Sequence, residues 1–330
     1  MEPQLENPSS RISFANEPKL SEYEVQKDFN ERRIALVPHI KDFVSTHERF
    51  VDKEVRITFS EKGVSSLVSI LETSDEKLVL KIPLSLAFAE GEDLFLKTWA
   101  EAGVKVPDVI EAGKLNGHSY ILYTFVDAQV LDDVYTHEEK IDQGIYLEMG
   151  KTLRRMHEPE AHGYGRVVGG EAEFQSFEEW LSSPDMQKKI DYVIGNGLIS
   201  DAHGSFDVAC GVLKDFVSKN KKSSYCHDDF GALNIFATAP ITVFDPNPKF
   251  NHGYLDLGKT IVNQLKYGLF PKELVEAYFG DESCDERALH ASVFVNACMK
   301  LPYQHKKNKP EIVRNIQEYL IKNKHLLHSI

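Results

Sequence analysis

The sequence predicts an α+β protein with two lobes, a small antiparallel β lobe that carries one helix and a larger, mainly helical lobe. Between residues 55 and 126, short runs of β-branched and aromatic residues alternate with turn residues, which is typical of antiparallel strands. After Asp127, apolar residues recur at helical spacing instead. Among these helices lies one polar loop between apolar segments, Tyr225 to Phe236, which is followed by a strand that ends at Asp245.

The length of 330 residues allows these two lobes and an N-terminal extension. We place a tail with a helical extension at residues 1–54, the small lobe at residues 55–126 and the large lobe at residues 127–330. Residues 1–20 are polar and contain three prolines, so we expect a loose tail there. Residues 21–50 have a helical pattern that Pro38 interrupts.

The net charge is −13, which disfavours nucleic-acid binding because such binding depends on neutralising phosphates. No apolar run reaches the about 20 residues that a membrane-spanning helix needs. The N-terminus has no basic segment followed by an apolar one, and the four cysteines form no Cys-x-x-Cys pair, so we expect a cytoplasmic protein without disulfides. An acidic cleft would concentrate a cationic partner, but solubility is the preferred explanation of the net charge, because net charge does not locate the charges.

The polar loop has the content that phosphoryl transfer requires. His227 and Asp229 are followed by Asn234, in the pattern His-x-Asp-x-x-x-x-Asn, and Asp245 comes after two short apolar segments. These segments suit antiparallel strands, so Asp229, Asn234 and Asp245 are expected at strand ends, where polar side chains converge. A kinase needs an acid that accepts the hydroxyl proton, and an Asn and an Asp that bind magnesium on the phosphates. A solvated loop with chance acids is the alternative.

The first predicted hairpin joins residues 55–59 to residues 67–71 through a turn that contains Gly63, Ser65 and Ser66. In a kinase-like lobe, the backbone amides and hydroxyl groups of this turn would touch phosphate. An ordinary solvent-exposed turn has the same sequence, and both interpretations stay open.

Lys81 lies between Leu80 and Ile82 in the next predicted strand, residues 77–83. A lysine in a buried strand needs a partner, and nucleotide phosphates or a glutamate of the following helix, from about Leu86 to Ala102, would supply one. An edge-strand lysine in solvent is the alternative. Two further strands, joined by a turn at Asn116 and Gly117, complete a five-stranded lobe. In the large lobe, apolar spacing predicts helices at residues 141–156, 174–181, 208–217, 272–279, 289–301 and 311–325.

With this loop and this lysine in order, the chain resembles the aminoglycoside phosphotransferase family, which are small-molecule kinases of the protein-kinase-like fold. The resemblance implies that Asp229 is the catalytic base and that His227 supports the loop. It implies that Asn234 and Asp245 bind Mg²⁺. The family usually has His-Gly-Asp, whereas this chain has Asp228 in place of the glycine, which leaves the local backbone open.

The resemblance extends to the nucleotide site of the small lobe. It implies that Lys81 aligns the phosphates of ATP or GTP and pairs with Glu92, about three helical turns before residues 103–107, with Glu90 as the alternative. It also implies that backbone atoms hold the adenine edge where the chain leaves the small lobe, at Thr124, Phe125 and Val126.

Three other features of the large lobe receive structural interpretations. Asp256 matches an Asp of the family and would cap a helix or brace the catalytic loop. His157, at a helix end, is more typical of a capping residue than of a ligand. The basic segment from Lys306 to Lys309 is typical of a solvated surface. Candidate acceptor-binding acids, which loop surface would equally explain, are Asp127, Asp132 and Asp133.

The implied function is a Mg²⁺-dependent transfer of phosphate from ATP or GTP to a hydroxyl group of a small molecule, by a monomer or dimer. An aminoglycoside-type antibiotic fits an acidic protein, but choline, homoserine, methylthioribose, sugar amines and macrolides are alternatives that fold cannot separate. A protein kinase is disfavoured because Pro246 and Asn247 follow Asp245 in place of Phe-Gly. A nucleotide-binding pseudokinase scaffold is the non-enzymatic alternative, because of Asp228 and the single glycine in the phosphate turn.

Overall fold

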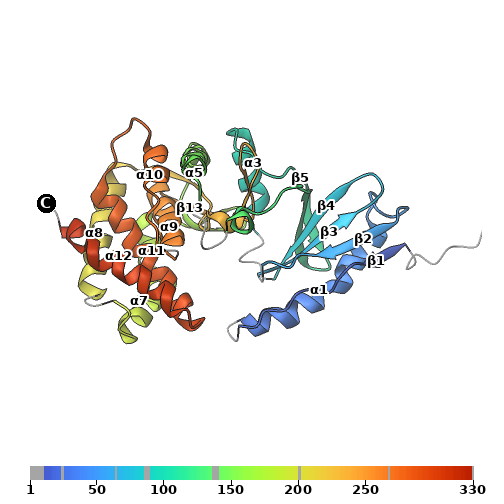
Figure 1. Cartoon of the computed structure of the whole chain (residues 1–330), viewed down its shortest axis with the longest axis horizontal. Coiled ribbons are helices and arrows are strands. Elements are labelled where there is room, and N and C mark those ends of the chain that lie inside the picture. Colours follow the sequence, from blue (N-terminus) through green and yellow to red (C-terminus); the bar gives the residue numbers. More distant parts are fainter. Residues whose placement is uncertain are drawn as a thin grey trace, which may run out of the picture. The chain divides into compact units, whose positions relative to one another are not determined.

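A computed structural model of the chain describes residues 11–23, 26–63, 65–84, 90–135, 141–199, 202–266 and 268–328. The chain forms two compact units (Figure 1). Unit 1 comprises residues 1–93 and 107–127, and unit 2 comprises residues 94–106 and 128–330. Within the described ranges, every helix is too short or too polar to cross a membrane.

Unit 1 contains a six-stranded sheet in the order β1-β2-β3-β4-β6-β5. The strands in chain order are β1 (Ile12–Phe14), β2 (Val55–Phe59), β3 (Ser66–Glu72), β4 (Lys77–Pro83), β5 (Val109–Leu115) and β6 (His118–Thr124). Strands β2 to β6 pair antiparallel, as predicted. Strand β1 was not predicted, because the segment was expected to be a loose tail. It pairs parallel with β2, and the Asn16 side chain bonds the backbone of Phe59 at both its N–H and its carbonyl.

Helix α1 (Lys27–Thr46) packs one face on this sheet. Leu36, Ile40 and Phe43 are buried in the same hydrophobic core as the inward residues of the strands. Pro38 lies inside the helix, where the sequence predicted an interruption. A proline inside a helix costs about 3 kcal/mol, whereas each large apolar side chain that is buried contributes about 1.5–3 kcal/mol. Burial of the apolar face therefore outweighs the proline.

Helix α3 (Glu92–Glu101) begins in unit 1 and continues in unit 2. Its predicted start at Leu86 lies outside the described residues. In unit 2, Trp99 on this helix is fully buried, and its indole N–H donates to the carbonyls of Met156 and Tyr225. The helix therefore contacts the strand that leads into the polar loop.

Unit 2 is mainly helical. Its further helices are α4 (Leu131–Val134), α5 (Gln143–Met156), α6 (Phe177–Leu181), α7 (Pro184–Gly195), α8 (Ala202–Lys219), α9 (Gly253–Leu265), α10 (Lys272–Phe279), α11 (Glu286–Lys306) and α12 (Pro310–His328). Helix α11 packs against α7, α8, α9 and α12 (Figure 1). Its buried residues recur along most of its length, which is typical of a central helix.

Short strands complete unit 2. A five-stranded sheet has the order β7-β10-β13-β8-β9, with β7 (Glu160–Ala161), β8 (Tyr164–Val168), β9 (Glu171–Phe174), β10 (Ser223–Cys226) and β13 (Lys249–Asn251). The predicted pair of short strands near the polar loop is confirmed as β11 (Ile235–Phe236) and β12 (Thr242–Val243). Phe174, which was predicted to begin a helix, ends β9, and the helix begins at Phe177.

Helices α9 and α11 approach each other closely at Gly258. A Cβ atom at Gly258 would lie 2.3 Å from the Ser292 hydroxyl and 2.8 Å from the Ser292 backbone, so a larger residue does not fit. The Asn296 amide also donates to the carbonyl of Leu255, at 2.8 Å. These contacts hold the first turns of α9, which carry Asp256, in a defined position against α11.

Candidate active site

The polar loop follows β10 and is held by Asp256. The loop runs into a short 3-10 helix, η3 (Ala232–Asn234), and then into β11. One Asp256 oxygen accepts the backbone N–H of His227 at 2.7 Å, and the other accepts that of Asp228 at 2.8 Å. Asp256 is only 2% exposed, so these charge-assisted bonds form away from water. Of its two predicted structural roles, Asp256 has the bracing one, since His252 is the cap of α9.

His157 completes this brace. It caps the C-terminal end of α5, as predicted, and its Nε2 also lies 3.0 Å from Asp256 Oδ2. Its Nδ1 lies 2.9 Å from the Tyr278 hydroxyl. Together with Cys226, His157 and Asp256 form a buried cluster of potential metal ligands. Burial raises the pKa of the Cys226 thiol well above its ordinary value, and the His and Asp already bond each other, so we interpret this cluster as structural.

His227 connects the loop to the segment that carries Asp245. The imidazole is fully buried and stacks on Trp99, with ring centroids 5.7 Å apart. Its Nε2 lies 3.1 Å from the carbonyl oxygen of Phe244, the residue before Asp245. A carbonyl can only accept, so Nε2 carries the proton in this contact. The backbone N–H of Phe244 in turn donates to the backbone carbonyl of Asn234.

The structure places Asn234 directly beside Asp229. The amide nitrogen of Asn234 donates to the Asp229 carbonyl at 2.9 Å and to Asp229 Oδ2 at 3.3 Å. Asn263 on α9 lies 3.4 Å from the other carboxylate oxygen. The Asn234 amide oxygen accepts no hydrogen bond from the described residues. Amide and carboxylate oxygens are ligands that Mg²⁺ prefers, so the side-chain chemistry of Asn234 and Asp245 is compatible with the ion.

Asp228 adopts the backbone conformation for which glycine is usual. Its φ is +53°, in the left-handed region that Asp tolerates better than most residues. Its Oδ2 accepts from Lys249 at 2.5 Å and from Lys259 at 3.3 Å, and from the Asn247 amide at 2.8 Å. Burial alone would raise the pKa of Asp228, but the two lysines hold it well below its ordinary value. Neither lysine was expected here, because both lie far from Asp228 in the sequence.

In unit 1, Lys81 and Glu92 form a buried ion pair. Lys81 Nζ lies 2.5 Å from Glu92 Oε2, and both side chains are about 5% exposed or less. Lys81 sits in the middle of the sheet, opposite Val68 on β3 and Ile121 on β6. Glu92 is the first residue of α3. The pairing that the resemblance implied is therefore present in the geometry.

The other cofactor residues expected in unit 1 lie in two places. Gly63 has a φ of +80° in the turn before β3, Ser66 is buried at the start of β3, and Ser65 accepts the Leu84 N–H through its carbonyl. At the other place, the amides of Thr124 and Phe125 donate to the carbonyls of Asp108 and Lys77. Among the described residues, the amide of Val126 has no such partner, so of these three amides it is the one open to a ligand.

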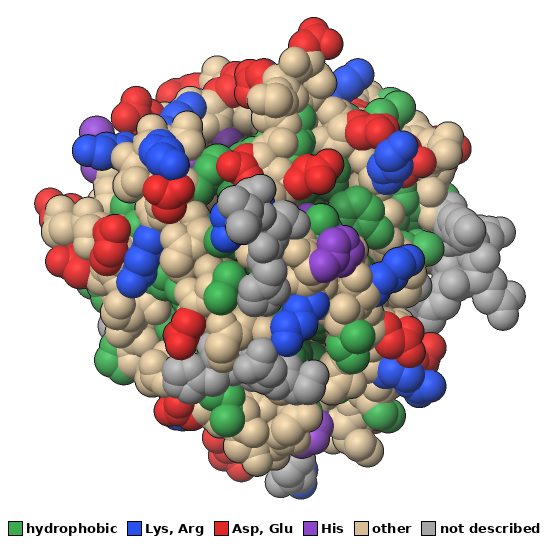
Figure 2. Space-filling model, turned by 90° about the vertical axis from the view of Figure 1, so that its left-hand side faces the viewer, with side chains coloured by type: hydrophobic (Ala, Val, Ile, Leu, Met, Phe, Trp, Pro, Cys, Tyr) green, Lys and Arg blue, Asp and Glu red, His purple; other side chains and the backbone are tan. Residues whose placement is uncertain are grey.

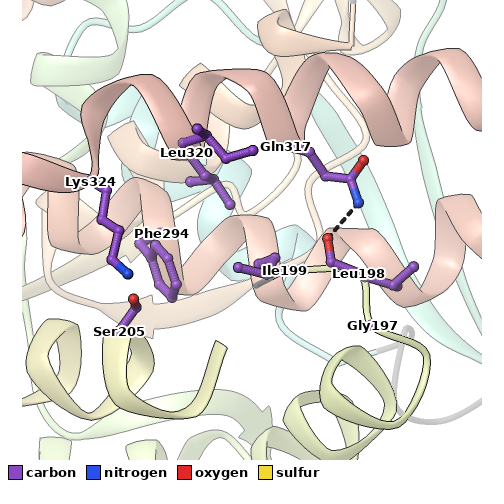
Figure 3. Close-up of a pocket in the computed structure, with 9 residues that line it drawn as sticks. Gly197, Leu198, Ile199, Ser205, Phe294, Gln317, Leu320 and Lys324 are labelled. Carbon is purple, nitrogen blue, oxygen red and sulfur yellow. Dashed lines mark hydrogen bonds between the residues drawn. The ribbon is translucent and has the colours of Figure 1, made fainter. Parts of the chain in front are cut away.

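A cavity of 210 Å³ lies elsewhere in unit 2, between the α7–α8 connection and the helices α11 and α12 (Figure 3). Leu198, Phe294 and Leu320 make much of its wall, and the Gln317 amide donates to the Leu198 carbonyl at one end. None of the residues expected in the active site lines it. The cavity therefore does not enter the chemistry of the polar loop.

Comparison with known proteins finds phosphotransferases and kinases. The model of the phosphotransferase enzyme family matches residues 56–247. A probable ketoamine kinase of Staphylococcus aureus (strain NCTC 8325 / PS 47) is 23% identical over 207 residues, a match that spans 58% of this chain and 66% of that protein's length. 

Two solved structures are similar in fold. A thermostable mutant of aminoglycoside phosphotransferase APH(4)-Ia, bound to AMP-PNP and hygromycin B, has a TM-score of 0.61 at 14% identity and covers 87% of this chain and 98% of its own. A GDP complex of an aminoglycoside 2′-phosphotransferase-IIIa mutant has a TM-score of 0.54 at 14% identity and covers 87% of this chain and 97% of its own. The predicted protein-kinase-like fold is thereby confirmed.

Replacing Lys81 tests the buried pair in unit 1. Lys81→Met leaves the Glu92 carboxylate buried without its partner and is expected to cost about 3–5 kcal/mol of unfolding free energy in urea titrations. The double variant Lys81→Met, Glu92→Leu should recover most of that loss, because no charge stays buried. Lys77→Met, on the exposed end of the same strand, serves as the control and should cost less than about 1 kcal/mol. Equal free energies of unfolding for the single and double variants would contradict the cost assigned to the unpaired Glu92 carboxylate.

Asp228→Gly separates backbone strain from charge pairing. Glycine relieves the positive φ by about 1–2 kcal/mol, but it leaves Lys249 and Lys259 without their shared carboxylate, at about 3–5 kcal/mol. We therefore expect Asp228→Gly to lower the free energy of unfolding measured in urea. Adding Lys249→Met to this variant should restore part of the loss. The control is Asn308→Gly, an exposed residue with a φ of +52° that should be neutral or slightly stabilised. A stabilised Asp228→Gly would show that strain dominates.

Proposed function

The chain belongs to the phosphotransferase enzyme family, and we propose that it transfers the terminal phosphoryl group of ATP or GTP to a hydroxyl group of a small molecule. The observation that carries the proposal is the arrangement of Asp229. Its carboxylate has one oxygen 3.3 Å from the Asn234 amide and the other 3.4 Å from the Asn263 amide, on a loop whose backbone is fixed by Asp256. A base held in this way is oriented before the acceptor arrives.

In the proposed reaction, Asp229 accepts the proton of the acceptor hydroxyl as its oxygen attacks the terminal phosphorus, and the nucleoside diphosphate leaves. The amide of Asn234 keeps the carboxylate in place. Asn234 and Asp245 would hold Mg²⁺, which when bound offsets the negative charge of the triphosphate. His227 holds the two segments that carry these ligands together, through its bond to the Phe244 carbonyl. Such catalysis consists mainly of positioning and electrostatic stabilisation.

Unit 1 supplies the proposed contacts to the nucleotide. Lys81, oriented by Glu92, would bind the phosphates as a fixed positive charge. The turn at Gly63, with Ser65 and Ser66, would contribute backbone amides and hydroxyl groups. The Val126 amide would meet the edge of the base, because the amides of Thr124 and Phe125 are engaged within the protein. AMP-PNP and GDP in the two related structures support a nucleotide donor without deciding between ATP and GTP.

For the acceptor, we propose a sugar that carries an amine nitrogen. The match to a probable ketoamine kinase supports this class, and ketoamines and aminoglycosides both belong to it. An aminoglycoside-type antibiotic is the narrower candidate within this class. Choline and homoserine lack the sugar and rank lower. The alternative to an active phosphotransferase is a scaffold that binds nucleotide without turnover, and the experiments must distinguish the two.

The nucleotide site is tested by thermal shift with ATP and GTP, each with and without Mg²⁺, on wild type and Asp245→Asn. Asp245 has a φ of +53°, which Asn tolerates, so this variant removes the charge and leaves the backbone unstrained. We expect a Mg²⁺-dependent rise in melting temperature for wild type, since a ligand of the folded state stabilises it, and a loss of that rise in the variant.

Asp281→Asn is the control, because Asp281 is an exposed acid elsewhere in unit 2. Its nucleotide response should equal that of wild type. Two results count against the proposal. No shift of wild type with either nucleotide would remove the kinase assignment, and an unchanged Mg²⁺-dependent shift in Asp245→Asn would remove Asp245 from the metal site.

A further inference from the structure

Two lysines, one from α9 and one from α11, lie beside the polar loop of unit 2. On α9, Lys259 and Asn263 lie four residues apart and therefore on one face of the helix. From α11, the Lys300 ammonium donates to the Asn263 side-chain oxygen at 3.0 Å. The Asn263 amide nitrogen in turn lies 3.4 Å from Asp229. Lys300 is thus separated from the proposed catalytic base by a single side chain.

The ion-pair partner of Lys259 also serves a second lysine. Lys259 shares the Asp228 carboxylate with Lys249, and both ion pairs are formed by the same oxygen, Oδ2. Asp229 and Asp256 act on Lys259 as well, but neither forms an ion pair with it, so among the described residues its one ion-pair partner is a carboxylate that it shares. Burial would lower the pKa of Lys259, but the nearby aspartates, first of all Asp228, raise it above its ordinary value.

Lys300 is half-buried, and its hydrogen-bond acceptor is a neutral amide. Among the residues that the structure describes, no carboxylate lies within the 4.0 Å of an ion pair with it. Burial lowers the pKa of Lys300 to about 8, with Lys259 and Lys266 acting in the same direction and Asp229 against it. A positive charge that is half-buried without an ion pair costs stability. Because Lys300 lies beside Asp229, we interpret it as a residue that is kept to bind a ligand and not to stabilise the fold.

We propose that Lys259 and Lys300 form a subsite that binds an anionic group, a carboxylate or a phosphate, of the acceptor beside the hydroxyl that Asp229 activates. The inference rests on the proposed function and narrows its acceptor to a sugar–amine that also carries an anionic group, such as the carboxylate in the ketoamine of an amino acid, or a phosphate.

The net charge of −13 favours a cationic acceptor, whereas the two lysines favour an acceptor that also carries an anionic group. Net charge does not say where charges lie. On the face of unit 2 that Figure 2 shows, acidic and basic side chains are interspersed over the surface, which is typical of a soluble protein. The charge that bears on the acceptor is the local one at the loop, where Lys259 shares its ion-pair partner with Lys249 and the hydrogen-bond acceptor of Lys300 is a neutral amide.

The subsite is tested with two matched pairs of probes, each measured by isothermal titration without AMP-PNP and again in saturating AMP-PNP and Mg²⁺. The pairs are fructose 6-phosphate against fructose, and the ketoamine of glucose with glycine against that with ethanolamine, which lacks the carboxylate. AMP-PNP fills the place of the donor's terminal phosphate, so an anion that still binds occupies the acceptor side. With AMP-PNP present, we expect wild type to prefer the member that carries the carboxylate or phosphate in at least one pair by tenfold or more.

Lys300→Met should remove most of that preference and leave the binding of AMP-PNP unchanged. Lys272→Met, at an exposed lysine at the start of α10, is the matched control and should bind all probes as wild type does. No preference in either pair, or an undiminished preference in Lys300→Met, overturns the inference. Anion binding that disappears when AMP-PNP is added also overturns it, because the lysines would then hold the donor phosphate.

A second measurement separates this role from a structural one. At pH 7, below the pKa of Lys300, removal of its half-buried charge should raise the melting temperature of Lys300→Met above that of wild type. A lower melting temperature would show that Lys300 stabilises the fold and is not kept for a ligand. Failure of wild type to bind AMP-PNP refutes the proposed function itself, whereas AMP-PNP binding without anion preference refutes only the subsite.

Discussion

The site in unit 2 depends on the hydrogen bonds that the Asp256 carboxylate accepts. This carboxylate accepts the backbone N–H groups of His227 and Asp228 and bonds His157, all at 3.0 Å or less. Without it, two buried backbone donors would lack partners, at about 1–3 kcal/mol each. Asp256 can do this because α9 is pressed against α11 at Gly258. The central helix therefore fixes α9, α9 fixes the loop, and the loop presents Asp229.

The buried charges of the protein fall into two kinds. Lys81 with Glu92 in unit 1, and Asp228 with Lys249 in unit 2, are paired at 2.5 Å, and their main effect is to hold geometry. Such pairs contribute little net stability, because desolvation offsets the attraction, but they are costly to break. Lys300 is of the other kind, with a neutral amide as its acceptor. A group whose charge is not matched within the fold is available to match a charge on a ligand.

Much of the fold and the order of the candidate site could be predicted from local sequence. The strands β2 to β6 show alternating apolar residues, and the polar loop has its residues within one short segment. Contacts between distant segments left no local pattern. Asp228 meets Lys249 and Lys259 across 21 and 31 residues, and His157 meets Asp256 across 99. Strand β1 was missed for a similar reason, because its three residues are ordered by pairing with β2 and not by their own propensity.

The most direct test of the central claim is phosphoryl transfer from ATP to sugar–amine acceptors by wild type and Asp229→Asn, followed by phosphorus NMR. AMP-PNP affinity is measured on the same samples. The account predicts a phosphate ester with wild type and a rate at least about 10²-fold lower in the variant, since general-base catalysis contributes that much or more. Nucleotide affinity should be equal in both. A variant that keeps the wild-type rate, or a wild type that binds nucleotide yet forms no ester and hydrolyses no ATP, would contradict it.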